Sequence, residues 1–340
     1  MLWSLPSIFH SLTHNAVIRR LQGPSCYFSE PITPDLYSWV IRDIDWSRFA
    51  YTQYVTNTEY LCNSVILFEA LERLESKADR VMLYPSNFEL DPASRSVESQ
   101  LLMKARDEYK VKLVPIEVQH KNDPARMCSQ SCRALELTII GIWGDSYTKL
   151  LAFNQTQYER LIVLDSDATI LKNMDELFFV PSAPVTLPQA YWLEKPTLGS
   201  HIMVIEPSTQ EFERIQKAIK KSPPTDYDME IINRLYGSTC SILPQRPYAL
   251  LSGEFRSRKH TNYLGHEPVN WDPEATFNDA KYVHFSDFPL PKPWEATQVQ
   301  MTQTRPACFI NEQNRRDCRA RDLWLKLYND YNENKKVCFK

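Results

Sequence analysis

Glycine is scarce in this chain of 340 residues: only 7 residues are glycine, whereas 23 are proline. Glycine-rich loops bind phosphate groups because residues without a side chain let backbone N–H groups approach the ligand closely. Neither of the two common loop patterns, Gly-x-x-x-x-Gly-Lys and Gly-x-Gly-x-x-Gly, occurs in the sequence. If the protein binds a nucleotide, a metal ion and cationic side chains must therefore hold the phosphates.

Strong charge of one sign and long apolar runs are also lacking. The formal net charge is −3, so the composition indicates no nucleic-acid partner. The first residues, 1–9, contain no basic segment and are too few to span a bilayer. We therefore expect no membrane span in this chain, and as given it is expected to be soluble and cytoplasmic.

Cysteine is sparse, with 8 residues, and no Cys-x-x-Cys pair occurs. This number is too small for a disulfide scaffold in a chain of this length, and the spacing predicts no structural zinc site. Three cysteines, Cys308, Cys318 and Cys338, cluster near the C-terminus. They could include one disulfide if the compartment oxidises thiols.

Strands alternate with helices in the first half of the chain, which predicts an α/β fold with a doubly wound parallel sheet. Apolar and β-branched segments predict strands at 49–55, 80–84, 111–116 and 161–164, and apolar periodicity predicts helices after residue 58, at 93–109 and near 147–153. Beyond residue 180 the pattern becomes mixed, with strands at 201–205 and 282–284 and helices at 209–221, 228–236 and 322–331. We expect an irregular N-terminal arm at 1–45, one main domain at 46–300 and a C-terminal helical extension at 301–340.

The predicted strand Leu161–Leu164 ends in two carboxylates, Asp165 and Asp167. Four consecutive apolar residues are typical of a strand buried on both faces, and ligands bind at the carboxyl ends of such strands. Alternate residues of an extended segment point the same way, so both carboxylates can bind one divalent cation that attracts phosphates. The alternatives are a solvated Asp-rich turn and the nucleophile loop of a haloacid-dehalogenase-type phosphatase, which Asp165, Asp167 and Thr169 fit.

The phosphatase hypothesis makes further demands on the sequence. Such enzymes place the nucleophile loop near the start of the domain, whereas here well-formed strand–helix units precede Asp165. They also need a downstream acidic pair that completes a magnesium site. Asp226 and Asp228 lie instead in a segment that is typical of a helix start. The surrounding sequence therefore weakens this alternative.

A segment near the C-terminus separates the remaining interpretations. His284 follows a short predicted strand, and eight residues later comes Lys292-Pro293-Trp294. Together with the Asp pair, this segment resembles a signature of the family-8 glycosyltransferases, to which glycogenin belongs. Further segments that resemble the family, over about residues 48–295, are 55–60, 148–150, 198–204 and 226–233. The tail at 318–324 makes the resemblance closest to the fungal branch of N-acetylglucosaminyltransferase-like members.

The resemblance implies a GT-A type fold, that is, a single Rossmann-like mixed sheet flanked by helices, with a C-terminal extension. It also implies metal-dependent transfer of a sugar from a UDP-sugar, with Mn²⁺ as the metal and Mg²⁺ as the alternative. The implied residues are Asp165, Asp167 and His284 for the metal; Asp228, Lys292 and Lys149 for catalysis; and Thr56, Asn57, Tyr60, Lys149, Ser166 and Lys292 for the UDP-sugar. Tyr60 is the candidate platform for the uracil ring. The alternatives are solvated surface lysines for Lys149 and Lys292 and a core aromatic side chain for Tyr60.

Two departures from the family pattern leave the donor sugar open. Where glycogenin-type members have Asn-Ser-Gly, this chain has Gly199-Ser200-His201. Where they have Asp-Gln, it has Asp228-Met229, and both segments are those with which the family recognises the sugar. The expected donor is UDP-N-acetylglucosamine or UDP-glucose, and family-8 enzymes retain the anomeric configuration. The expected acceptor is a glycan, a protein or a small molecule. A homodimer is possible. A protein that binds a UDP-sugar without activity is left open as an alternative function. The alternative compartment is the Golgi lumen, where relatives often lie.

Overall fold

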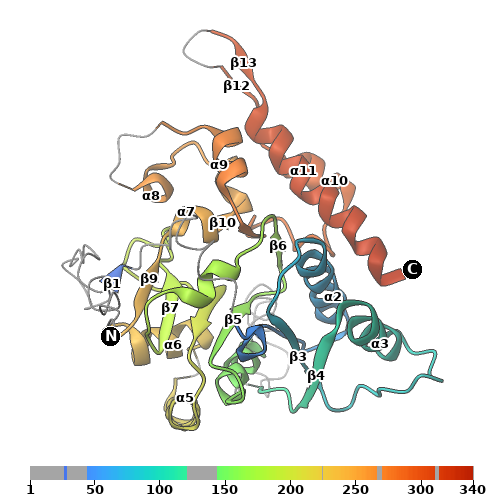
Figure 1. Ribbon diagram of the computed structural model, residues 1–340. Helices are drawn as coiled ribbons and strands as arrows, with labels where there is room; N and C mark the ends of the chain where they lie inside the picture. The colour runs from blue at the N-terminus through green and yellow to red at the C-terminus, as the bar shows by residue number, and fades with distance from the viewer. Residues whose placement is uncertain are drawn as a thin grey trace, which may run out of the picture.

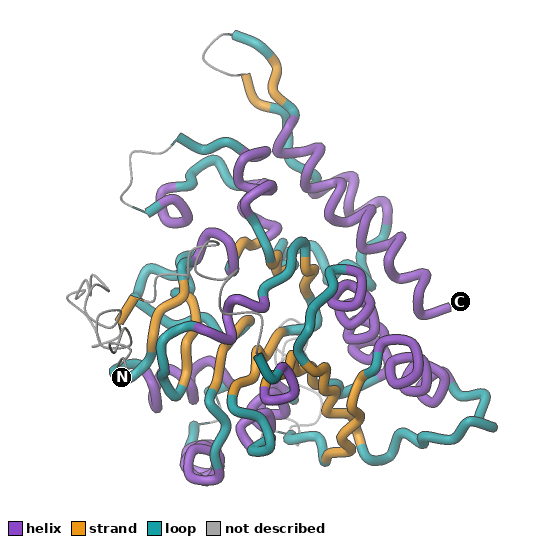
Figure 2. Tube along the Cα trace, in the orientation of Figure 1, coloured by secondary structure: helices purple, strands orange, loops and turns teal. Residues whose placement is uncertain are grey.

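A mixed sheet of eight strands forms the centre of the molecule, and helices cover both of its faces (Figure 1, Figure 2). This computed structural model describes residues 27–28, 44–120, 144–223, 225–265, 270–310 and 314–339. Most of the predicted N-terminal arm, 1–45, lies outside the described residues.

The first half of the sheet is parallel, as the alternation of strands and helices predicts. It consists of β2 (Phe49–Tyr54), β3 (Asp79–Pro85) and β4 (Val111–Ile116), joined by α2 (Thr58–Arg73) and α3 (Val97–Tyr109). Asn57 caps α2 by accepting a hydrogen bond from the backbone N–H of Tyr60 at 3.0 Å. Ser96 caps α3 in the same way, which is why this helix begins at Val97 and not at the predicted residue 93.

The direction of strand pairing changes at β5 (Arg160–Leu164). This strand lies parallel to β2 and antiparallel to β8 (Ile202–Ile205). Beyond β8 follow β7 (Val185–Pro188), β9 (Ser241–Leu243) and the edge strand β1 (Tyr27–Phe28), so the order is β1-β9-β7-β8-β5-β2-β3-β4. Residues 161–164 are all buried, as expected of a strand covered on both faces. The structure confirms the predicted mixed α/β sheet.

Two hydrophobic clusters, one on each face of the sheet, produce a three-layer α/β/α arrangement. On one face α2 and α3 lie beside the long C-terminal helix α11 (Arg319–Asn334) (Figure 1). On the other face lie α5 (Thr209–Lys221), α6 (Asp228–Tyr236) and the 3₁₀ helix η5 (Ser146–Asn154), where the sequence predicts a helix.

Several short elements connect these layers. They are η3 (Trp46–Arg48), η6 (Asp175–Phe179), α7 (Gln245–Tyr248), η7 (Ser252–Arg256), α8 (Thr261–Leu264), α9 (Pro273–Asp279), α10 (Gln298–Thr304), β12 (Phe309–Ile310), β13 (Arg316–Asp317) and η8 (Lys335–Phe339). Within the described part of the chain, no helix combines the length and the apolar character that a membrane span requires.

A second sheet, of three strands, brings the predicted histidine to the Asp pair. β6 (Ala168–Ile170) follows directly after the pair and lies antiparallel to β11 (Tyr282–His284), so that His284 is opposite Ala168. β10 (Leu250–Leu251) lies on the other side of β11. The sequence predicts β11 but neither β6 nor β10, because strands of two or three residues give only a weak periodic signal.

The C-terminal helix α11 belongs to the main core, since Trp324 is fully buried. In the loop after β11, the carboxylate of Asp287 accepts hydrogen bonds from Trp324 Nε1 at 2.9 Å and from the Tyr328 hydroxyl at 2.8 Å. The hydroxyl of Ser252 donates to the same carboxylate. α11 therefore fixes the loop that follows His284.

Two disulfides reinforce the C-terminal part of the chain. One joins Cys308 to Cys318 within the tail, where the sequence allows one disulfide. The other joins Cys338 to Cys62 in α2. The sequence does not predict this second pair, because its two cysteines are 276 residues apart.

Replacing Asp287 by alanine is expected to destabilise the fold strongly. The residue is 5% exposed, and its loss leaves the two donors of α11 without their acceptor, while Arg256, 3.4 Å from Oδ1, loses its ion pair and keeps only the backbone carbonyl. Leaving such buried partners unpaired costs about 3–5 kcal/mol. Urea unfolding followed by tryptophan fluorescence measures the loss in the free energy of unfolding.

The control for this variant is Asp330→Ala. Asp330 forms an ion pair with Lys326 on the solvent-exposed side of the same helix. Its loss should cost less than about 1 kcal/mol. Equally small losses in both variants would contradict the structural role of Asp287.

Candidate functional site

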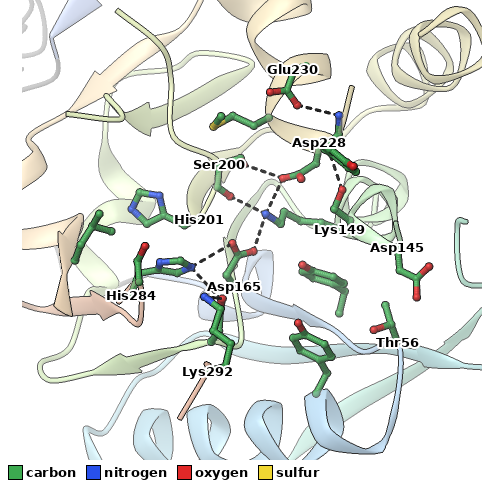
Figure 3. A pocket seen from close by; sticks show the side chains of 18 of the residues that line it. Thr56, Asp145, Lys149, Asp165, Ser200, His201, Asp228, Glu230, His284 and Lys292 are labelled. Carbon is green, nitrogen blue, oxygen red and sulfur yellow. Dashed lines mark hydrogen bonds and ion pairs between the residues drawn. The ribbon is translucent and has the colours of Figure 1, made fainter. Parts of the chain in front are cut away.

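A cleft of about 280 Å³ opens where the carboxyl ends of β2 and β5 meet the small sheet (Figure 3). Most of the residues predicted from the sequence line this cleft. They are Thr56, Tyr60, Lys149, Asp165, Asp167, Asp228, His284 and Lys292. Two predicted residues do not line it: the side chain of Asn57 caps α2, and Ser166 is buried outside the cleft.

Hydrogen bonds to the backbone fix the turn that carries the Asp pair. The N–H of Asp165 donates to the carbonyl of His201 at 3.0 Å, and the N–H of Phe285 donates to the carbonyl of Asp167 at 2.9 Å. The hydroxyl of Tyr282 lies 3.0 Å from the carbonyl oxygens of both Asp165 and His201. β5, β8 and β11 are thereby joined at one point, which holds the turn in place.

The side chains of Asp165, Asp167 and His284 converge into a cluster that fits a divalent cation. The Nε2 atom of His284 lies 3.1 Å from Oδ1 of Asp167 and 4.0 Å from Oδ2 of Asp165. One ligand atom from each residue lies within 4.8 Å of the others. Carboxylate oxygens with one imidazole nitrogen suit manganese or magnesium better than a soft metal.

Lys149 forms the most buried ion pairs of the site. This residue is 3% exposed, and its Nζ lies 2.6 Å from Asp165 Oδ1 and 2.7 Å from Asp228 Oδ2. The ammonium also donates to the carbonyl of Ser200 at 3.1 Å, so that each of its three protons has an acceptor nearby. Lys149 is therefore part of the interior and not a solvated surface lysine.

Lys292 pairs with the other carboxylate of the Asp pair. Its Nζ lies 2.6 Å from Oδ2 of Asp167 and donates to the carbonyl of Phe285 at 2.6 Å. Its side chain is 26% exposed, so solvent reaches it more readily than Lys149. Prolines at 291 and 293 restrict the backbone on either side of the lysine.

Burial and charge pairing decide how these groups ionise. Burial opposes ionisation of Asp167, but the charges of His284 and Lys292 outweigh it and hold the pKa of Asp167 well below its ordinary value. Burial raises the pKa of Asp165; Lys149 opposes this rise, and the Asp167 carboxylate adds to it. Burial lowers the pKa of Lys149, yet its two carboxylate partners outweigh burial and raise it, so this residue stays cationic.

The charge balance of the site favours an added cation. With the His284 imidazole neutral, as metal binding requires, the carboxylates of Asp165, Asp167 and Asp228 outnumber the two lysines that pair with them. A divalent ion would turn this excess of negative charge into an excess of positive charge, which attracts a diphosphate. The arrangement can therefore hold a metal and, beside it, a ligand that carries phosphate.

Aromatic side chains line the end of the cleft next to β2. Tyr60, in the first turn of α2, packs edge-on against Trp294 with the ring centroids 5.5 Å apart. Nζ of Lys149 lies 5.8 Å from the ring centroid of Tyr54, the last residue of β2. This end of the cleft presents flat apolar surface, whereas the Asp pair presents charge.

Several lining residues are not predicted from the sequence; among them are Tyr54, Trp192, Leu251 and Ser286. They belong to a strand end and to loops, and no spacing pattern marks them. His201, which appears in the sequence as a departure from the family pattern, is buried with its ring centroid 5.4 Å from that of His284. Burial, reinforced by the charges of His284 and Lys149, holds the pKa of His201 well below its ordinary value, so this ring is neutral.

Replacing the buried Lys149 by methionine should lower the free energy of unfolding by about 3–5 kcal/mol, because the buried Asp228 and the half-buried Asp165 lose their cation. Adding Asp228→Asn should recover part of this loss, since one unpaired charge is removed. Lys292→Met, at the more exposed pair, should cost less. Urea unfolding at pH 7 measures all three variants, and a loss below about 1 kcal/mol for Lys149→Met would contradict the buried pairing.

Comparison with known proteins finds relatives in fungi. The chain is 48% identical over 303 residues to glucose N-acetyltransferase 1 of Gibberella zeae, which covers 87% of this chain and 63% of the relative. The chain thus spans less than two thirds of that protein. It is 43% identical over 311 residues to glucose N-acetyltransferase 1 of Aspergillus fumigatus, which covers 87% of this chain and 78% of the relative. No protein-family model matches the sequence, so membership of glycosyltransferase family 8 stays a prediction.

Among solved structures, the apo structure of the bifunctional glycosyltransferase WbbM is similar to this chain. The TM-score is 0.51 at 14% identity, over 86% of this chain and 50% of that one. At this identity the likeness shows the fold alone, and it confirms the predicted GT-A type.

The identity to the Aspergillus fumigatus protein, over most of both chains, shows the family: the chain belongs to the glucose N-acetyltransferase 1 family.

Proposed function

We propose that this protein is a glycosyltransferase that moves a sugar from a UDP-sugar to a hydroxyl group of an acceptor. The observation that carries the proposal is the cluster of Asp165, Asp167 and His284 with Lys149 and Lys292 beside it. This cluster lies at the carboxyl end of β5, in a sheet of the type found in a known glycosyltransferase. Such an arrangement suits a reaction whose leaving group is a diphosphate.

The nucleotide is proposed to lie between the aromatic end of the cleft and the Asp pair. Tyr60 would stack on the uracil ring, and Thr56 would contact the nucleotide beside it; both line the cleft. Asn57 would act through Tyr60, because its cap fixes the first turn of α2. Ser166 would shape the turn between the two carboxylates from its buried position.

A divalent cation held by Asp165, Asp167 and His284, with Mn²⁺ favoured over Mg²⁺, would act as a Lewis acid on the diphosphate. As the bond from the anomeric carbon to the phosphate oxygen breaks, negative charge develops on UDP. Lys149 and Lys292 stabilise this charge, because ion pairs already hold them in place. Preorganised donors of this kind contribute roughly 3–4 kcal/mol each in other enzymes.

Asp228 is proposed to position the transferred sugar. Its carboxylate accepts a hydrogen bond from the Ser200 hydroxyl at 2.8 Å and pairs with Lys149, so it is held firmly at the start of α6. The proposed donor is UDP-N-acetylglucosamine or UDP-glucose; the names of the relatives refer to glucose and to an N-acetyl group. With an α-linked donor and retention of configuration, as in family 8, the product would be α-linked.

Two alternative functions have less support from the geometry. A haloacid-dehalogenase-type phosphatase needs a downstream acidic pair that completes a magnesium site. Here Asp228 begins α6 and binds Lys149, and Asp226 pairs with Arg234. A binding protein without activity has no need of two lysines held against the carboxylates that would face the leaving group.

The disulfides support the Golgi lumen over the cytoplasm as the proposed compartment. Disulfides persist in oxidising compartments and are rare in the cytosol.

Cys62→Ser removes the Cys62–Cys338 disulfide and should lower the free energy of unfolding by about 2–5 kcal/mol. Because this variant has already lost the disulfide, dithiothreitol should lower its free energy of unfolding less than that of the wild type. Urea unfolding with and without reductant measures this. Identical stability of the oxidised wild type and Cys62→Ser would contradict a structural disulfide.

Release of UDP tests the proposed function. UDP-N-acetylglucosamine, UDP-glucose, UDP-galactose and UDP-xylose are offered one at a time, with Mn²⁺ and with a chelator. Metal-dependent release from one donor, even as slow hydrolysis without an acceptor, is expected and would name the sugar. Acetyl-CoA with glucose is included because the relatives' name describes transfer of an acetyl group. Acetylation of glucose without UDP release would contradict sugar transfer.

Asp167→Asn should lower UDP release by about 10²–10³-fold, because the partner of both His284 and Lys292 loses its charge. The matched control is Asp107→Asn, since Asp107 is exposed and pairs with its neighbour Arg106. The control should keep full activity. Wild-type turnover by Asp167→Asn would rule out the proposed role of the Asp pair.

A further inference from the structure

Trp192 is more open to solvent than the other tryptophans that the structure describes, and it lines the cleft. It lies in the loop between β7 and β8, and 38% of its surface is exposed. A large aromatic side chain left open to solvent in a cleft indicates a surface that a ligand covers.

Neighbouring rings hold the indole in place. Its centroid lies 5.5 Å from that of His201, and the His201 ring lies 5.4 Å from that of His284. Tyr191 packs edge-on against the indole at 5.3 Å. The rings of His284, His201 and Trp192 therefore lie next to one another, from the proposed metal ligand to the open surface of the indole. These contacts hold the indole in place without a ligand.

Gly199 makes this arrangement possible. A Cβ atom at this position would lie 3.0 Å from ring atoms of His201 and 3.3 Å from Cη2 of Trp192. Any side chain at position 199 would push against both rings. The ring at position 201 and the indole of Trp192 therefore need a glycine at position 199.

Packing, and not hydrogen bonding, holds the His201 ring. Its Nε2 atom is buried and has no hydrogen-bond partner among the described residues. The ring also lies near Tyr282, with centroids 6.2 Å apart and an interplanar angle of 18°. The indole of Trp192 is tilted by 59° to the His201 ring, so His201 supports it as a buried, tilted neighbour.

We propose that Trp192, supported by His201, forms the acceptor subsite and that this subsite takes a pyranose ring, as found at the end of a glycan. The inference rests on the proposed function and names the acceptor class. The C–H face of a pyranose is apolar and packs on an indole face, while its hydroxyls stay available for hydrogen bonds. Ser286, which is exposed and lines the cleft, offers one such partner.

The position of this subsite fits an acceptor. In Figure 3, His201 lies on one side of His284 and Asp165, and Thr56 lies on the other, where the nucleotide is proposed to bind. A sugar stacked on Trp192 would therefore meet the donor across the metal cluster. An acceptor hydroxyl can then replace UDP at the anomeric carbon: the new C–O bond forms, the bond to phosphate breaks, and the hydroxyl proton leaves with the UDP side.

The test uses the full chain with Mn²⁺ and the donor that releases UDP. The acceptors are methyl α- and β-glycosides of glucose, mannose, galactose and N-acetylglucosamine, each compared with mannitol, which has hydroxyls but no ring face. Mass spectrometry should show transfer to at least one glycoside and none to mannitol. Transfer to no glycoside, or equal transfer to mannitol, would overturn the inference. UDP release without acceptor, measured on the same preparation, reports separately on the proposed function.

Variants locate the subsite. Trp192→Ala should raise the KM of the accepted glycoside about tenfold and Trp192→Phe about threefold, while the KM of the UDP-sugar changes less than about twofold. Gly199→Ala, which displaces both rings, should resemble Trp192→Ala. An unchanged acceptor KM, or a rise in the donor KM instead, would overturn the assignment.

Leu193→Ala is the matched control for these variants. Leu193 is the next residue and is 39% exposed, but it does not line the cleft. It should leave both KM values as in the wild type. An increase equal to that of Trp192→Ala would show that the loop and not the indole matters. Thermal unfolding of each variant confirms that it is folded, which is expected because Trp192 lies outside the core.

Discussion

The constraint on which the rest of the structure depends is a cluster of three carboxylates, of which Asp228 is buried and Asp165 and Asp167 are half-buried, with two lysines at the carboxyl end of β5. Moving an ion from water into a protein costs several kcal/mol unless partners replace its hydration. Lys149 meets this requirement through Asp165, Asp228 and the carbonyl of Ser200. Lys149 lies in η5, and its partners come from the turn after β5, from α6 and from the segment before β8, so the cluster forms only when both halves of the sheet are assembled.

The other half of the cluster depends on the C-terminal part of the chain. His284 and Lys292 reach Asp167 from β11 and the loop that follows it. That loop is held in turn by Asp287, whose carboxylate binds two side chains of α11. A site that gathers charge from distant segments thus requires a core that extends to α11, and the Cys62–Cys338 disulfide ties η8, which follows α11 directly, to α2.

The parallel half of the sheet and the Asp pair could be predicted from sequence because their signals are local. Strands of five to seven residues show apolar patterns, and Asp165 and Asp167 come where α/β sheets bind ligands. The short strand at 282–284 was predicted from its pattern, but the roles of His284 and Lys292 were indicated by resemblance, since a strand of three residues does not show what its side chains bind. The direction of a side chain was not predictable. The segment 55–60, which resembles the family, includes Asn57, yet the side chain of Asn57 caps α2 and does not line the cleft. Trp192 and His201 carry no signal in their spacing, because their contact arises from loop packing over Gly199.

The central claim is that one cation, shared by the Asp pair and His284, binds the diphosphate of a nucleotide sugar. The most direct measurement is the anomalous diffraction signal of manganese in crystals grown with Mn²⁺ and UDP. We expect one manganese peak bound by Asp165, Asp167 and His284, with the diphosphate against it and the uracil ring at Tyr60. Manganese bound elsewhere, or UDP bound away from the Asp pair, would contradict it.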